Sequence, residues 1–129
     1  MRLLLDTHVW LWLLADPHRL RPEVLDTLGD SRNELLLSAA SSWEIAIKSG
    51  LGRLTLPEPA ATYVPSRLRT TGTQPLPVEH AHALATAGLP RHHSDPFDRL
   101  LIAQSMLLDI PIVTADRQFE AYDVSVIRT

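Results

Sequence analysis

Short apolar runs alternate along this chain with longer segments in which apolar residues recur at helical spacing. Short continuous runs are typical of strands buried on both faces, and the helical spacing predicts amphipathic helices. The predicted strands are residues 2–5, 34–38, 74–78, 110–114 and 124–127, and the predicted helices are residues 8–14, 17–28, 41–48, 57–70, 78–87, 96–108 and 116–121. Because strands and helices alternate, the sequence predicts an α/β fold, a three-layer α/β/α sandwich with a central parallel sheet of four to five strands.

Proline and small polar residues mark several helix ends. The dipeptides Asp16-Pro17 and Asp95-Pro96 each have the pattern of an N-cap followed by a proline in the first turn. Ser41 and Glu44 have the spacing of a capping box, in which Glu44 would bond back to the start of its helix. Beyond that helix, Gly50-Leu51-Gly52 lacks the third glycine of a dinucleotide-binding loop, so it indicates a helix C-cap.

The composition narrows the choice of chemistry. The 129 residues fit one domain, residues 1–129, and the absence of cysteine excludes disulfides, thiolate metal sites and a Cys nucleophile. The longest apolar-rich run, residues 9–15, is too short to cross a bilayer, so we expect a cytoplasmic protein. Lys48 is the single lysine, and no P-loop motif is present. The net charge of -3 argues against broad, salt-driven binding to nucleic acid.

Four acidic residues stand where a parallel sheet would gather them. Asp6 and Asp116 follow the first and fourth predicted strands, while Glu44 and Asp98 fall in the first turns of predicted helices. The carboxyl ends of parallel strands share one edge, so these side chains are expected to converge there. Clustered carboxylates repel one another, and a set of oxygen ligands is typical of a Mg²⁺ or Mn²⁺ site. Helix capping is the alternative interpretation for each acid taken alone, and we assign it to Asp95.

Four ordered blocks of the sequence resemble a known family: LLLDTHVWLWL, SSWEIAIKSGLGRL, DPFDRLLIAQ and IVTADRQF. Together they resemble the PIN-domain ribonucleases, above all the VapC toxins of bacterial type II toxin–antitoxin pairs. The resemblance extends from Leu3 to the neighbourhood of Ile127, although residues 57–72 match no motif of the family.

This resemblance implies a PIN-like fold and an endoribonuclease that depends on Mg²⁺ or Mn²⁺. It places the family's acidic quartet on Asp6, Glu44, Asp98 and Asp116. Asp6, Asp98 and Asp116 would hold the metal ion, and Glu44 would position or deprotonate the attacking water. Thr114 matches a Ser or Thr that is often found near the metal in this family.

The family also implies partners for the chain. PIN toxins form homodimers, and a cognate antitoxin covers the acidic groove with its C-terminal segment. We therefore expect an RNA substrate, an antitoxin and a homodimer, and no membrane contact.

Basic and aromatic residues have two interpretations each. Several arginines are candidates for contacts with RNA phosphates, with a solvated helix face as the alternative: Arg53, Arg67, Arg69, Arg91, Arg99 and Arg117. Trp10, Trp12 and Trp43 are expected in the core or at an interface, with stacking on an RNA base as the alternative. His92 and His93 are interpreted as loop histidines outside the metal site.

This chain lacks residues that two other families with acidic sites require. A haloacid-dehalogenase-like phosphatase needs a second Asp two residues after the first and a later Lys, but His8 occupies that position and Lys48 is the only lysine. A receiver-type signalling domain needs a Lys after its last strand, and residues 110–129 contain none. A catalytically degenerate PIN domain that only binds RNA or a protein partner stays open as the alternative, although all four acids are present.

Overall fold

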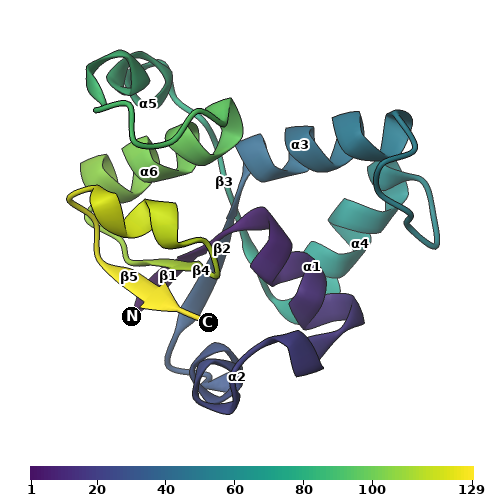
Figure 1. Cartoon of the computed structure of the whole chain (residues 1–129). Helices are drawn as coiled ribbons and strands as arrows, with labels where there is room; N and C mark the ends of the chain where they lie inside the picture. The colour runs from purple at the N-terminus through teal and green to yellow at the C-terminus, as the bar shows by residue number, and fades with distance from the viewer.

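In the computed structural model, which describes residues 1–129, five parallel strands form one central sheet (Figure 1). The strands are β1 (Arg2–Leu5), β2 (Glu34–Ser38), β3 (Gln74–Leu76), β4 (Ile112–Thr114) and β5 (Val126–Arg128), and their order is β3-β2-β1-β4-β5. The chain moves outward from β1 to β3 and then returns to the opposite side of β1 to add β4 and β5. This reversal creates a topological switch point between β1 and β4, which is where open α/β sheets bind ligands.

Helices cover both faces of this sheet. They are α1 (Thr7–Ala15), α2 (Pro22–Gly29), α3 (Ala39–Gly50), α4 (Ala60–Thr71), α5 (His80–Ala85) and α6 (Pro96–Leu108), joined by the short 3-10 turns η1 (Pro17–Arg19), η2 (Thr86–Gly88) and η3 (Arg117–Ala121). In Figure 1, α1, α2 and α4 lie on one side of the sheet, and α5 and α6 lie on the other. The predicted three-layer α/β/α sandwich is therefore confirmed. None of the helices combines the length and the apolar character needed to cross a membrane.

The strands send alternate side chains into two separate apolar clusters. Leu3 and Leu5 of β1 pack in a cluster with residues of α1, α2 and α4, whereas Leu4 packs in a second cluster with residues of α6. All three leucines are fully buried, and burial of such a side chain contributes about 1.5–3 kcal/mol. The continuous apolar run of β1 thus reflects a strand with no face in solvent.

The segment after α1 differs from the prediction. The sequence predicts one helix over residues 17–28, but η1 ends at Arg19 and α2 begins only at Pro22. Arg21 is extended, with φ -64° and ψ 145°, because proline disfavours a helical conformation in the residue before it. Asp16, the predicted cap, makes no hydrogen bond with its side chain at the start of η1.

The three tryptophans occupy three different environments. Trp10 lies fully in the core, and its ring nitrogen donates a hydrogen bond to Thr73 at 3.3 Å. Trp12 is partly buried beneath the guanidinium of Arg19, which lies 4.5 Å from the ring centre. Trp43 is 62% exposed and meets Phe97 edge to face, so the expected place in the core is confirmed for Trp10, and an interface stays the prediction for Trp43.

Candidate active site

Asp6 lies at the switch point, at the carboxyl end of β1. Its side chain makes no cap hydrogen bond to α1, although its backbone occupies the N-cap position. Instead, Asp6 Oδ2 accepts a hydrogen bond from Thr114 Oγ1 at 2.8 Å, while Asp6 Oδ1 is buried without a partner. Thr114 is within reach because β1 and β4 pair in register, with Leu5 beside Val113. Capping therefore does not explain Asp6, and its neighbour Thr114 orients the carboxylate.

Glu44 lies on α3 next to Lys48, deeper in the helix than the sequence predicts. α3 begins at Ala39, and Ser38 caps it by accepting a backbone N–H of the first turn at 3.0 Å. Glu44 is thus beyond the first turn, so the predicted capping box with Ser41 is wrong. Glu44 is 2% exposed; its Oε2 pairs with Lys48 Nζ at 2.5 Å, and its Oε1 is buried without a partner. A buried carboxylate with one open oxygen calls for a role other than capping.

Asp95 and Asp98 have separate tasks at the start of α6. Asp95 Oδ1 accepts the backbone N–H groups of Phe97 at 2.8 Å and of Asp98 at 3.1 Å, so the cap predicted for Asp95 is confirmed. Pro96 fits the first helical position because its missing N–H would have no helical partner there. Since Asp95 supplies the cap, the carboxylate of Asp98 is available to the neighbouring loop and to the site.

His93 bridges two of the predicted acids. Its Nε2 lies 3.0 Å from Asp98 Oδ2 and 2.9 Å from Asp116 Oδ2. Its Nδ1 accepts the backbone N–H of Asp95 at 3.1 Å. This contact leaves the proton of the neutral ring on Nε2, which can donate it to the carboxylates. The polar atoms of His93, Asp98 and Asp116 lie within 4.8 Å of one another, and with both ring nitrogens of His93 engaged the two carboxylates are the oxygens that could hold a cation.

Arg99 and Tyr122 fix the loop that carries His93. The Arg99 guanidinium donates to the hydroxyl of Tyr122 and to the backbone carbonyls of residues 86, 89, 90 and 93. The Tyr122 hydroxyl accepts the N–H of His93 at 2.9 Å, and the His93 ring packs edge-on against Phe119. Because its donors are used inside the fold, Arg99 fits neither a phosphate contact nor a solvated helix face.

The sequence interpretation of His93 missed its contact with the acids. His93 does lie in a loop, as predicted, but no local pattern shows that this loop folds back over the end of β4. That path depends on Arg99 from α6 and on Tyr122 after η3, which are brought together only by tertiary packing. The spacing between His93 and Asp98 alone matches no metal-binding motif.

Burial and mutual repulsion make Asp98 hard to ionise. The pKa of Asp98 is raised to about 8, first by burial and then by the negative charges of the nearby acids Asp6, Asp95, Glu44 and Asp116. Burial also raises the pKa of Asp6. The structure thus brings the four acids singled out in the sequence into one electrostatic cluster, with Asp98 near its centre.

The open polar atoms of this cluster fit a hard divalent cation. Asp6 Oδ1 and Glu44 Oε1 are buried without partners, and two further carboxylates lie around His93. A divalent charge would favour the ionised form of Asp98, because an opposite charge lowers the pKa of a carboxyl group. Carboxylate oxygens without any thiolate are the ligands that Mg²⁺ and Mn²⁺ prefer. The catalytic and metal-binding roles of the individual acids stay predictions.

Fold and site together define an α/β protein with an acidic cluster at the carboxyl edge of a parallel sheet. The family model of the PIN domain matches residues 3–125, and the chain belongs to the PIN domain family.

Two relatives from Mycobacterium tuberculosis strengthen this assignment. Ribonuclease VapC22 is 30% identical over 122 residues, which cover 92% of this chain and 90% of the relative. Ribonuclease VapC16 is 64% identical over 53 residues. This match is partial, since it covers 41% of this chain and 38% of that relative's length.

Solved structures of low sequence identity share the fold. VapBC2 from Rickettsia felis, bound to a DNA fragment from its promoter, superposes with a TM-score of 0.71 at 13% identity and covers 99% of this chain and 98% of that chain. DNA-bound VapBC from Salmonella typhimurium gives a TM-score of 0.71 at 18% identity, with the same coverage. The chain therefore shares its fold with the matched chains of these complexes.

Removing the charge of Asp98 should stabilise the metal-free protein at alkaline pH. The folded-state pKa of about 8 lies above the unfolded value of about 3.9, so the folded protein binds the extra proton and loses stability as the pH rises between these values. At about pH 8.5, Asp98→Asn should raise the free energy of unfolding in EDTA by more than about 1.4 kcal/mol, the equivalent of one pKa unit. Urea unfolding across this pH range measures the effect.

Asp109→Asn is the matched control for that measurement. Asp109 lies at the opposite end of α6 with φ 53°, a conformation that Asn also tolerates. A stability profile of Asp98→Asn that parallels wild type at every pH would contradict the raised pKa.

Replacing His93 should weaken metal binding while leaving the fold intact. His93→Phe removes the N–H that holds Asp98 and Asp116 together, whereas His93→Gln keeps a donor on a side chain of similar reach. Loss of such a supporting hydrogen bond costs about 10–100-fold in metal affinity, so Mn²⁺ should bind His93→Phe at least about tenfold more weakly than wild type, with His93→Gln in between. Calorimetric titration with Mn²⁺ measures this, with His92→Phe as the control. Wild-type affinity in His93→Phe would refute the positioning role.

Proposed function

We propose that this chain is a cytoplasmic, Mg²⁺-dependent endoribonuclease and the toxin of a VapBC-type toxin–antitoxin pair. One observation carries the proposal: the carboxylates of Asp6, Glu44, Asp98 and Asp116 gather at the switch point of a PIN fold, and two of them have buried open oxygens. The relatives VapC16 and VapC22 are named ribonucleases, which supports RNA as the substrate class.

Three acids would hold the metal ion, and one histidine would position two of them. Mg²⁺ held by Asp6, Asp98 and Asp116 would polarise a phosphoryl oxygen and activate a water for hydrolysis of the phosphodiester bond. Asp6 would offer its open Oδ1, since Thr114 already engages its Oδ2. Asp98 would release its proton on binding, because the cation offsets the burial and the like charges that raise its pKa to about 8. His93 would keep the Asp98 and Asp116 carboxylates turned toward each other.

Glu44 is the candidate to position the attacking water and accept its proton. Lys48 engages Oε2 and thereby fixes the carboxylate, while Oε1 keeps free lone pairs. Because Glu44 comes from α3 and the predicted metal ligands come from other elements, it approaches the cluster from a separate direction. A general base must reach the proton that it removes, and the open oxygen of Glu44 meets that need.

Neutral isosteres of the acids should abolish RNA cleavage while the fold persists. Asp6→Asn, Asp98→Asn and Glu44→Gln each remove a charge that stabilises the reaction by several kcal/mol, which corresponds to a loss of about a thousandfold in kcat/KM. The measurement is Mg²⁺-dependent cleavage of single-stranded RNA, with circular dichroism to verify folding. Asp109→Asn, the same change at the opposite edge of the sheet, should retain activity. RNA binding by wild type without cleavage would instead indicate the degenerate, binding-only PIN domain.

We further propose an antitoxin partner and a homodimer. VapBC complexes among the structures of this fold support the antitoxin, and a basic side chain of such a partner would offset the repulsion around Asp98. Co-expression with a cognate antitoxin should yield a complex that does not cleave RNA, whereas the free chain does. Light scattering on the free protein should give the mass of two chains. A monomer, or a complex that cleaves as fast as the free chain, would contradict these partners.

A further inference from the structure

A cavity adjoins the acidic cluster at Glu44 and has basic side chains on its wall. It has a volume of about 260 Å³ and shares Glu44 with the cluster. His8 of α1, Lys48 of α3 and Arg53 of the following loop all line it. The carboxylate that we propose to act on water therefore borders a space with basic groups from three separate segments.

The turn after α3 brings Arg53 next to Lys48. Gly52 has φ 72°, its N–H bonds to the carbonyl of Ser49 at 3.2 Å, and the N–H of Arg53 bonds to the carbonyl of Lys48 at 2.9 Å. This pair of bonds is a Schellman motif, whose left-handed residue is usually glycine. The motif often carries an apolar contact between the two residues that are here Lys48 and Arg53. Two cations thus occupy a place where a hydrophobic pair is common.

Arg53 is the unpaired cation of this cavity. Lys48 pairs with Glu44, whereas Arg53 forms no ion pair and no hydrogen bond with its side chain. Its charge repels that of Lys48, and a bound anion would offset this repulsion. The cavity therefore offers a free guanidinium to an anionic ligand beside the acids.

We propose that this cavity binds a phosphate of the RNA strand next to the phosphate that is cleaved, with Arg53 as its main ligand. The inference rests on the proposed ribonuclease function. It gives the place where the RNA strand continues beyond the acidic cluster. Glu44 belongs to both the acidic cluster and this cavity, so a strand that runs past its side chain meets Lys48 and Arg53. A guanidinium can form two parallel bonds to a phosphate. Such backbone contacts set the register of a strand without reading its sequence.

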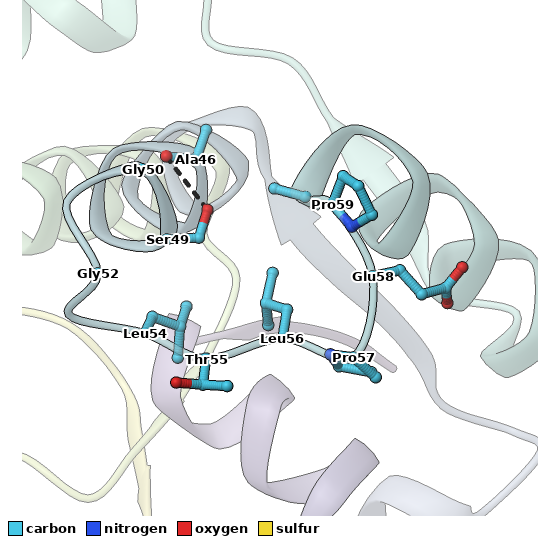
Figure 2. A pocket seen from close by; sticks show the side chains of 11 residues that line it. Ala46, Ser49, Gly50, Gly52, Leu54, Thr55, Leu56, Pro57, Glu58 and Pro59 are labelled. Atoms are coloured by element: carbon cyan, nitrogen blue, oxygen red, sulfur yellow. Dashed lines mark hydrogen bonds between the residues drawn. The ribbon is translucent and has the colours of Figure 1, made fainter.

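The larger groove on the same loop lacks this chemistry. Figure 2 shows it between the end of α3 and the start of α4, with a volume of about 650 Å³. Leu54, Leu56 and Pro57 contribute apolar surface to it, and its charged residue, Glu58, already pairs with Arg67 at 3.2 Å. An acidic, largely apolar groove does not favour a phosphate, so the smaller basic cavity is the subsite.

Arg53→Gln tests the subsite, with Arg69→Gln as the matched control. Arg53 is exposed, so glutamine keeps a polar, unbranched side chain and the backbone turn while removing the charge. Arg69 is also exposed but lies at the end of α4, which leads into the amino end of β3 on the opposite edge of the sheet. The probe is a short, 5′-fluorescein-labelled single-stranded RNA with Mg²⁺.

The subsite predicts a specific split in the kinetics. Arg53→Gln should raise KM about tenfold with kcat nearly unchanged, because it loses a charge-assisted bond to a part of the substrate that does not react. The slope of log(kcat/KM) against log[KCl] should fall by about 0.7, the value for one phosphate contact on a single strand. A neutral methylphosphonate at the contacted position should weaken wild type equally and have no further effect on Arg53→Gln.

Two results would overturn the subsite: kinetics of Arg53→Gln equal to those of Arg69→Gln, or additive losses at every methylphosphonate position. Failure of the ribonuclease proposal looks different, because wild type would then not cleave the probe at all. In that event, fluorescence anisotropy with the same RNA still decides the question. Weaker binding by Arg53→Gln than by Arg69→Gln supports the subsite, and equal binding, or no binding by wild type, refutes it.

Discussion

Repulsion between carboxylates at the switch point is the constraint on which the rest of this structure depends. Two carboxylates about 5 Å apart repel by about 3 kcal/mol at an effective dielectric constant near 20, and Asp98 lies among four other acids. The backbone beneath them is held by apolar packing, since Asp6 follows a strand with three fully buried leucines and β4 pairs with that strand. Burial of the core therefore maintains a site that its own charges would disperse.

The side chains around the cluster fix the orientation of the acids but leave some carboxylate oxygens without a partner. Thr114 engages one oxygen of Asp6 and Lys48 engages one oxygen of Glu44, so each of these acids keeps a buried oxygen open. The other two acids share the imidazole of His93. Asp6 and Glu44 are each oriented through one oxygen, and their open oxygens point to a cation as the missing partner, whereas Asp116 also accepts the backbone N–H of Gln118 through Oδ1 at 2.9 Å. Preorganisation of this kind lowers the cost of assembling a site when metal and substrate bind.

The parts of the fold that depend on local pattern were predictable, and the parts that depend on contacts through space were not. The order of strands and helices, the acids at strand ends and the cap by Asp95 all follow from short stretches of sequence. Pro22 divides a segment whose apolar spacing alone predicts one helix, and Ser38 caps α3 earlier than the pattern around Glu44 indicates. His93 reaches the acids only because a distant tyrosine and arginine hold its loop, and no local signal encodes that.

The arginines show why net charge is a poor guide to the binding surface of this protein. Arg99 gives its donors to carbonyls of the loop before α6, and Arg67 pairs with Glu58, so neither has a free donor face for RNA. Arg53 has the same chemistry but no partner, and the turn at Gly52 presents it to a cavity beside Glu44. The availability of a cation depends on whether the fold has already satisfied its donors. A chain with net charge -3 can therefore still attract a phosphate locally, because four of its acids lie in the proposed cation site and a guanidinium beside that site has no partner.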